Sequence, residues 1–140
     1  MFSTITHHDN YIHRLSHDGR AIVIDPGDAA AVSEWLQRDG LSLEAILITH
    51  HHGDHTGGSD ALRAATGCTV YAPHGGRVTV DRVVGGGDTV PWSGGRLDVL
   101  DVAGHTEHDV AYYAREEAVV FTGDVLFHCG CGRVGGGRYE

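Results

Sequence analysis

Apolar and polar residues alternate along this chain in short blocks, which predict strands around two helices. Short strands are expected at residues 2–5, 11–15 and 20–24. A helix is expected over Ala29–Arg38, with Asp28 as its N-cap and Gly40 just past its end. Its apolar positions share one face, as in an amphipathic helix: Val32, Trp35 and Leu36.

The middle of the chain continues this pattern. An apolar run at residues 45–48 predicts a buried strand, and a second helix is expected over residues 56–65. Residues 70–121 are expected to form short strands separated by Gly, Pro and Asp turns. One glycine-rich turn, Gly85–Asp88, lacks the Lys and the Ser or Thr of a phosphate-binding loop. The mixture of elements indicates an α/β (α+β) chain organised as one unit without linkers or repeats.

The segment after the strand at 45–48 carries four potential metal ligands in the spacing H-x-H-x-D-H: His50, His52, Asp54 and His55. A tight turn through Gly53 can direct His50 and His52 to one metal, and Asp54 and His55 to a second. Neutral imidazoles with a carboxylate suit zinc, iron or manganese. An incidental histidine tract is the alternative, but the Asp and the fourth His at fixed offsets favour a catalytic metal site.

Two later strand ends each carry another potential ligand. His105 follows the apolar-rich run 97–103, and Asp124 follows the run 118–121. Residues just past strand ends are presented by a rigid scaffold to a cleft. The carboxylate of Asp124 can bridge two cations, because each of its oxygens can bind one.

Composition narrows the class of protein. The net charge of −9 disfavours non-specific binding to nucleic acid. The start of the chain lacks the basic and apolar regions of a secretory signal, and no apolar run approaches the roughly 18 residues of a membrane span. Three cysteines, two of them in Cys129-Gly-Cys131, give no indication of an oxidising compartment, and the pair is too closely spaced for the usual zinc motif. We expect a cytoplasmic protein with these thiols reduced in a packed turn.

Taken together, the H-x-H-x-D-H element, His105 and Asp124 resemble the signature of the metallo-β-lactamase superfamily. Within it the chain resembles glyoxalase II, the hydroxyacylglutathione hydrolase family, in several further stretches: Asp9-Asn10-Tyr11, Ile24-Asp25-Pro26-Gly27, Gly57-Gly58, Thr122–Phe127 and Cys129–Arg133. The resemblance covers nearly the whole chain. It implies the αββα sandwich of that superfamily.

The resemblance also implies roles for the ligands: His50, His52 and His105 on a first metal, Asp54 and His55 on a second, and Asp124 as the bridge. Two divalent ions are therefore expected, with zinc in first place and iron or manganese as alternatives. Asp54 and Asp124 are the implied catalytic residues, and Asp54 is suited to orient or deprotonate the nucleophile. The implied reaction converts S-D-lactoylglutathione and water to D-lactate and glutathione.

Contacts to the glutathione part of the substrate are implied for a basic residue of the last loop. Either Arg133 matches it, or Arg138 with Tyr139 does, because the sequence after Arg133 departs from the family pattern. The loop of His105 departs as well, in His105–Asp109, which leaves the support of this histidine open. Rival functions are a lactonase or β-lactamase-like hydrolase, a persulfide dioxygenase, and a fragment that binds metal without turnover.

The length of 140 residues is short for this family. The family's second metal takes a later histidine, and a C-terminal helical domain completes its glutathione site. We expect residues 1–140 to form a metallo-β-lactamase-like domain truncated in its second half, without that helical domain. The alternative is a short form that self-associates through unpaired sheet edges. His128 is a further candidate for the missing ligand.

Overall fold

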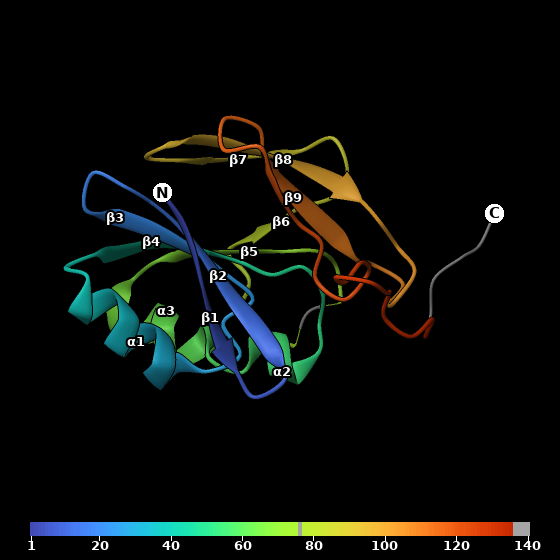
Figure 1. The fold of residues 1–140 in the computed structure, drawn as a ribbon, viewed down its shortest axis with the longest axis horizontal. Helices are drawn as coiled ribbons and strands as arrows, with labels where there is room; N and C mark the ends of the chain where they lie inside the picture. Colours follow the sequence, from blue (N-terminus) through green and yellow to red (C-terminus); the bar gives the residue numbers. More distant parts are fainter. Residues whose placement is uncertain (76, 136–140) are drawn as a thin grey trace.

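The computed structural model describes residues 1–75 and 77–135, which form two β-sheets packed face to face (Figure 1). The six-stranded sheet contains, in spatial order, β1 (Phe2–His7), β2 (Asn10–His17), β3 (Arg20–Ile24), β4 (Ser42–Leu47), β5 (Thr69–Ala72) and β6 (Arg82–Val83). The four-stranded sheet contains β10 (Val119–Phe121), β9 (Val110–Ala114), β8 (Gly95–Asp101) and β7 (Thr89–Trp92). The helices are α1 (Ala29–Arg38), α2 (Gly53–Thr56) and α3 (Ser59–Thr66).

The apolar core has two layers. One lies between the sheets, where Ile22 and Leu47 of the first sheet meet Val99 and Tyr112 of the second. The other lies between the six-stranded sheet and the helices α1 and α3, and its members include Trp35, Ile46, Leu62 and Val70. Strands β3 and β4 are parallel neighbours buried on both faces, which accounts for their continuous apolar sequence. The expected α/β sandwich is therefore present.

The first helix forms as predicted. It spans Ala29–Arg38, and the side chain of its N-cap Asp28 accepts a hydrogen bond of 2.7 Å from the backbone N–H of Ala31. Gly40 follows the helix with a φ of +65°, the left-handed conformation that terminates many helices. The three apolar positions predicted to share a face are all buried.

The second predicted helix, over residues 56–65, is confirmed from Ser59 onward, but it does not begin at residue 56. The chain instead forms the short helix α2 and then α3, with Gly57 and Gly58 between them. The N–H of Gly58 donates to the carbonyl of Pro26 at 2.8 Å, and a Cβ on Gly58 would lie only 2.6 Å from the backbone N of Ala29. Close packing against the β3–α1 connection therefore interrupts the helix.

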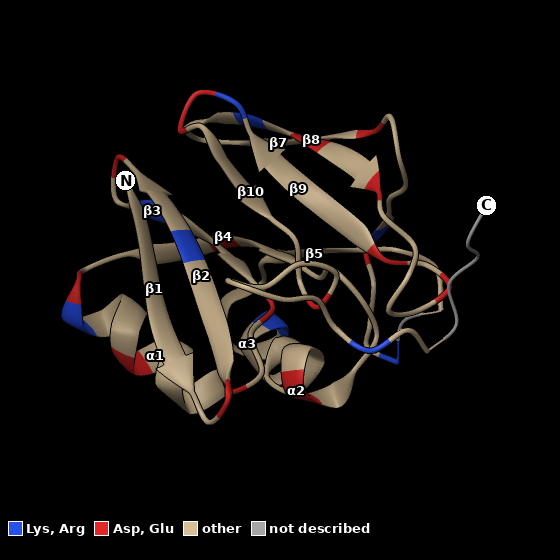
Figure 2. Ribbon diagram, turned by 45° about the vertical axis from the view of Figure 1, so that its right-hand side comes forward, with Lys and Arg blue, Asp and Glu red and all other residues tan. Residues whose placement is uncertain are grey.

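Charged residues of both signs are spread over strands, helices and turns in the described part of the chain (Figure 2). The described residues include no helix that is long and apolar enough to cross a membrane.

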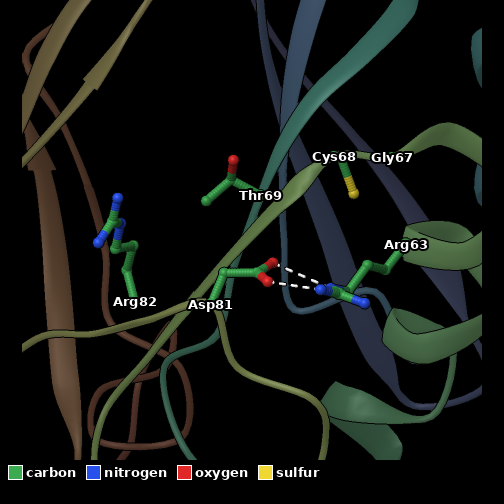
Figure 3. Close-up of a pocket in the computed structure, with 6 residues that line it drawn as sticks. All are labelled: Arg63, Gly67, Cys68, Thr69, Asp81 and Arg82. Atoms are coloured by element: carbon green, nitrogen blue, oxygen red, sulfur yellow. Dashed lines mark hydrogen bonds and ion pairs between the residues drawn. The ribbon is translucent and has the colours of Figure 1, made fainter.

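Asp81 joins α3 to the amino end of β5. Its carboxylate accepts two hydrogen bonds from the guanidinium of Arg63, at 2.6 and 3.0 Å, and one from the backbone N–H of Val70 at 2.9 Å. These groups border a hollow of about 500 Å³ (Figure 3). Because the Asp81 carboxylate is fully used by internal partners, we assign this hollow a structural role.

We expect Asp81→Asn to lower the free energy of unfolding at pH 7. Hydrogen bonds from Arg63 and from the Val70 N–H lower the pKa of Asp81 from 3.8 to about 2. A carboxylate with a lowered folded pKa stabilises above its unfolded pKa, and this stabilisation is lost as the pH falls through the folded pKa. The difference in the free energy of unfolding between the variant and the wild type, measured by urea denaturation, should therefore disappear as the pH falls from about 4 to about 2.

Asp18→Asn is the matched control, because Asp18 lies in an exposed turn. Equal effects of the two substitutions at pH 7 would contradict the role given to Asp81.

Candidate metal centre

Three strand ends deliver the candidate ligands to one edge of the sandwich. His50 follows β4 and is buried at 1% exposure, and the next turn carries His52 into α2. His105 follows β8, and Asp124 follows β10. The sequence separation between these segments is large, so the sandwich itself brings the side chains together.

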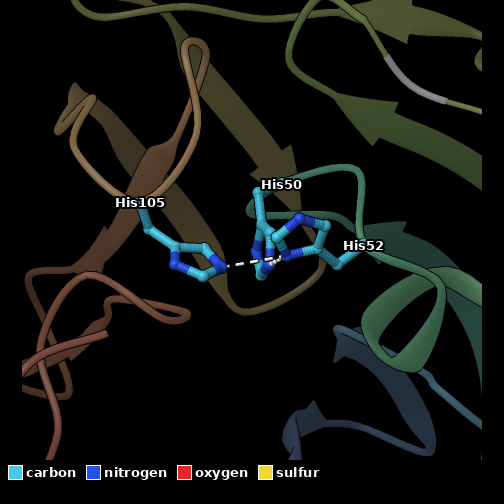
Figure 4. Close-up of side chains that lie close together, drawn as sticks. All are labelled: His50, His52 and His105. Atoms are coloured by element: carbon cyan, nitrogen blue, oxygen red, sulfur yellow. Dashed lines mark hydrogen bonds between the residues drawn. The ribbon is translucent and has the colours of Figure 1, made fainter. Parts of the chain in front are cut away.

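Three imidazoles converge in a first cluster (Figure 4). Nδ1 of His52 lies 3.1 Å from Nε2 of His50 and 2.9 Å from Nε2 of His105. Nε2 of His105 lies 3.5 Å from Oδ2 of Asp124. Three ring nitrogens and one carboxylate oxygen thus point into one small volume, the donor set that zinc and related cations take.

The tautomers are consistent with metal binding at these nitrogens. The hydroxyl of Thr49 donates to Asp25 at 2.7 Å, so its oxygen is left to accept from Nδ1–H of His50 at 3.0 Å. The backbone carbonyl of Arg133 accepts from Nδ1–H of His105 at 2.7 Å. In both rings the proton is held on Nδ1 and the lone pair of Nε2 is free. Burial lowers the pKa of His50 to about 4, which keeps this ring neutral.

His55 forms a second cluster with two carboxylates. Its Nε2 lies 3.2 Å from Oδ1 of Asp124 and 3.9 Å from Oδ2 of Asp54. Asp124 therefore turns one oxygen to His55 and the other to His105, as a bridging carboxylate would. Nε2 of His55 is buried, and its contact with Asp124 lacks the direction of a hydrogen bond. A buried nitrogen without a hydrogen-bond partner, facing two carboxylates, fits a cation site.

Asp25 supports the whole cluster from behind. Its buried carboxylate accepts hydrogen bonds from the backbone N–H and hydroxyl of Thr49, at 2.8 and 2.7 Å, and from Nδ1 of His55 at 3.0 Å. Burial opposes a charge on His55, but Asp124 and Asp25 outweigh it and raise its pKa to about 10. The site is thus strongly negative and attracts positive charge.

Two supporting residues escaped the sequence reasoning. Asp25 and Asn10 both lie in stretches that resemble glyoxalase II, but the sequence analysis gives neither a role, although the place of Asp25 at the end of a predicted strand is a usable signal. Asn10 begins β2, and its side-chain amide donates to Oδ2 of Asp54 at 2.7 Å. No pattern in the sequence indicates this contact, because it joins residues far apart in the chain.

The loop of His105 has its own support, which resolves the question left by its sequence. Asp109 accepts hydrogen bonds from the backbone N–H groups of Gly104 and Thr106, at 3.1 and 2.7 Å, and from the hydroxyl of Thr106. This buried carboxylate fixes the backbone on both sides of His105, and the carbonyl of Arg133 fixes its ring.

The remaining candidates lie as follows. The carbonyl of Arg133 is next to the centre, whereas Arg138 and Tyr139 lie outside the described residues. His128 borders a cavity of about 550 Å³ that also reaches His55 and Asp124, but it joins neither cluster. Cys129 and Cys131 are free thiols and both are exposed, so the prediction that they fill a packed turn is wrong.

Comparison with known proteins decides the family. A model described as the metallo-beta-lactamase superfamily matches residues 7–139. The chain belongs to this superfamily. The resemblance to this superfamily and the expected sandwich fold are therefore confirmed.

Its curated relatives include hydroxyacylglutathione hydrolases. The chain is 46% identical over 136 residues to that of Chromohalobacter salexigens, with 94% of this chain and 53% of the relative covered. It is 48% identical over 129 residues to that of Methylobacillus flagellatus, with 90% and 51% covered. The chain thus spans about half the length of the curated relatives it matches.

Solved structures of the superfamily share the fold. The B3 metallo-beta-lactamase BLEG-1 superposes with a TM-score of 0.86 at 32% identity, over 98% of this chain and 79% of that one. ETHE1 from Myxococcus xanthus superposes with a TM-score of 0.85 at 29% identity, over 95% and 61%.

We expect Asp25→Asn to lower the free energy of unfolding of the metal-free chain by about 2 kcal/mol, because hydrogen bonds to a buried charge are lost. The raised pKa of His55 stabilises the fold fully below about pH 6.5, and this contribution is lost as the pH rises through about 10. Over this pH range, the free energy of unfolding should decline less in the variant than in the wild type. Denaturant titrations with a chelator present measure this difference. Asp9→Asn, in the exposed β1–β2 turn, is the control, and an equal loss there would refute the assignment.

Proposed function

We propose that this chain carries the binuclear centre of a metal-dependent thioester hydrolase of the glyoxalase II type. The reaction is the hydrolysis of S-D-lactoylglutathione to D-lactate and glutathione. The observation that carries the proposal is the placement of Asp124, with one oxygen toward His55 and the other toward His105. Relatives named hydroxyacylglutathione hydrolase, at 41% to 48% identity, support the substrate class.

Each cluster would hold one cation. The first would bind to the three imidazoles of His50, His52 and His105 and the second to Asp54 and His55, with Asp124 shared. Zinc is proposed first, with iron or manganese as alternatives, since imidazole and carboxylate suit all three. When bound, such cations supply hydroxide near neutral pH and polarise the carbonyl that it attacks.

The chain's own residues position the reacting groups. Asn10 holds the Asp54 carboxylate, which is suited to orient the attacking water or to accept its proton. Hydrolysis breaks the carbon–sulfur bond of the thioester and releases the glutathione thiolate. The cavity of about 550 Å³ beside His55 and Asp124 gives the thioester a place next to the centre. The guanidinium of Arg133 or Arg138 would pair with a carboxylate of glutathione.

Hydrolysis of a β-lactam is the second candidate, because the solved B3 metallo-beta-lactamase shares the fold at 32% identity. A lactone is a third possible substrate of the same chemistry. A persulfide dioxygenase with a single iron would leave the cluster around His55 without a role. The cytoplasm and the detoxification of methylglyoxal are the proposed setting of the thioesterase.

Parallel assays with lactoylglutathione, a lactone and a β-lactam test the proposal, each with the chain loaded with zinc, iron or manganese. We expect turnover of the thioester above that of the other two substrates. Faster turnover of the lactone or the β-lactam would overturn the glutathione assignment.

We expect metal titration to show a tight and a weaker step. The first cluster offers four donors and the second only three among the described residues. The loss of a supporting contact alone weakens metal binding roughly 10–100-fold, so a missing donor should separate the steps by at least this factor. His55→Ala should remove the weaker step, and His105→Ala the tighter one, as measured by calorimetry.

His51→Ala is the matched control, since His51 lies in the same histidine tract but in neither cluster. Equal affinities of the two steps, or loss of binding in the control, would contradict the assignment of ligands.

We expect Arg133→Ala to raise KM for lactoylglutathione more than it lowers kcat, because the contact is to a part of the substrate remote from the reaction. An unchanged KM in this variant, with a raised KM for Arg138→Ala, would transfer the role to Arg138.

A further inference from the structure

Two exposed thiols lie in the loop that leads away from Asp124. Cys129 and Cys131 are free and exposed, whereas Cys68 is buried in the core beneath α3. Cysteines that serve only to fill space are among the most buried residues. The position of this pair therefore needs a chemical explanation.

Cys129 has an imidazole beside its sulfur. The Sγ atom lies 3.7 Å from Nδ1 and 3.9 Å from Nε2 of His128. A neighbouring imidazole can take the proton of a thiol, and the thiolate is the form that attacks disulfides. Cys131 has no such contact with a histidine among the described residues.

The backbone around Cys129 forms a tight turn. Residues Phe127 and Gly130 pair through hydrogen bonds of 2.9 and 3.4 Å, and Cys129 has a φ of +67°. Gly130, the residue between the two cysteines, can adopt conformations that bring its neighbours together. Closing a disulfide there would require the turn to rearrange, because disulfide geometry is specific.

The same loop holds two residues of the metal centre. The N–H of Gly132 donates to the carbonyl of Asp124 at 2.9 Å, and a Cβ at Gly132 would lie only 1.9 Å from that oxygen. The carbonyl of Arg133 accepts from Nδ1 of His105 at 2.7 Å. One and two residues after Cys131, the backbone is therefore in direct contact with proposed ligands and has no room to shift without moving them.

We propose that Cys129 and Cys131 form a thiol–disulfide exchange site for small disulfides such as oxidised glutathione, and that oxidation of this pair weakens the metal centre. The coupling to metal rests on the proposed function, which assigns His105 and Asp124 as ligands. The thiol chemistry itself rests only on the loop.

The exchange proceeds in two balanced steps. The thiolate of Cys129 attacks one sulfur of oxidised glutathione, the disulfide bond breaks, and one glutathione thiolate leaves. The thiolate of Cys131 then attacks the Cys129 sulfur of this mixed disulfide and expels the second glutathione thiolate. Two cysteine thiols are oxidised to one disulfide, one glutathione disulfide is reduced to two thiols, and the two protons pass to the leaving thiolates.

The consequence for the metal follows from the loop contacts. Rearrangement at Gly130 moves the backbone of Gly132 and Arg133, so His105 loses the carbonyl that fixes its ring. Loss of such a partner weakens metal binding roughly 10–100-fold. Reduction by a dithiol should restore the affinity.

The test is incubation of the zinc-loaded chain with oxidised glutathione, followed by intact mass and zinc content. We expect the wild type to lose two hydrogen atoms, to keep no glutathione and to bind zinc at least tenfold more weakly, in line with the loss of a supporting contact. In Cys131→Ser the reaction should stop after the first step and leave a stable glutathione adduct on Cys129. His128→Ala should slow the first step, and Cys68→Ser should behave as the wild type.

An unmodified wild type, a lasting adduct in place of the disulfide, or equal rates for Cys129→Ser and the wild type would overturn the exchange site. Formation of the disulfide with unchanged zinc affinity would overturn its coupling to the metal. These results are distinct from failure of the proposed function, because mass and zinc content do not depend on turnover. An active thioesterase with inert thiols refutes only the exchange site, and a reactive pair in a chain without thioesterase activity refutes only the proposed function.

Discussion

The buried carboxylate of Asp25 is the constraint on which the candidate metal centre depends. It follows directly after β3 in a left-handed conformation, with a φ of +53°, and so turns its side chain toward the neighbouring strand end. There it receives the N–H and hydroxyl of Thr49 and Nδ1 of His55. One carboxylate therefore fixes the direction of the chain after β4, the direction in which the Thr49 hydroxyl donates, and the orientation of the His55 ring. Through Thr49 it also sets the tautomer of His50.

Two histidines five residues apart respond to this environment in opposite ways. His50 is held by a neutral hydroxyl and buried, so its pKa falls to about 4. His55 lies between the carboxylates of Asp25 and Asp124, so its pKa rises to about 10 despite burial. A cation held by Nε2 of His55 and by Asp124 would replace the proton on that nitrogen and leave both rings neutral. The supporting hydrogen bonds thus prepare the histidines for metal before any metal binds.

Sequence reasoning predicted what local patterns encode. The helix over Ala29–Arg38 carries its own cap and amphipathic face, and the ligand motif His50–His55 is a fixed local spacing. The split between α2 and α3 escaped prediction, because its cause is the approach of Gly58 to a loop distant in sequence. The contact of Asn10 with Asp54 escaped for the same reason. Contacts between segments far apart in the chain depend on how the two sheets pack, so they cannot be predicted from the local patterns of one sequence.

The fold alone does not decide the substrate. Structures named as a B3 metallo-beta-lactamase and as ETHE1 superpose on this chain almost equally well, with TM-scores of 0.86 and 0.85. Function must therefore be argued from the groups around the shared centre. Here these are the β1–β2 hairpin, which brings Asn10 to Asp54, and the loop after Asp124, whose Arg133 carbonyl fixes His105. Because this loop holds the ring of a proposed ligand and carries the arginine proposed to bind the substrate, we expect changes in it to alter metal affinity and specificity together.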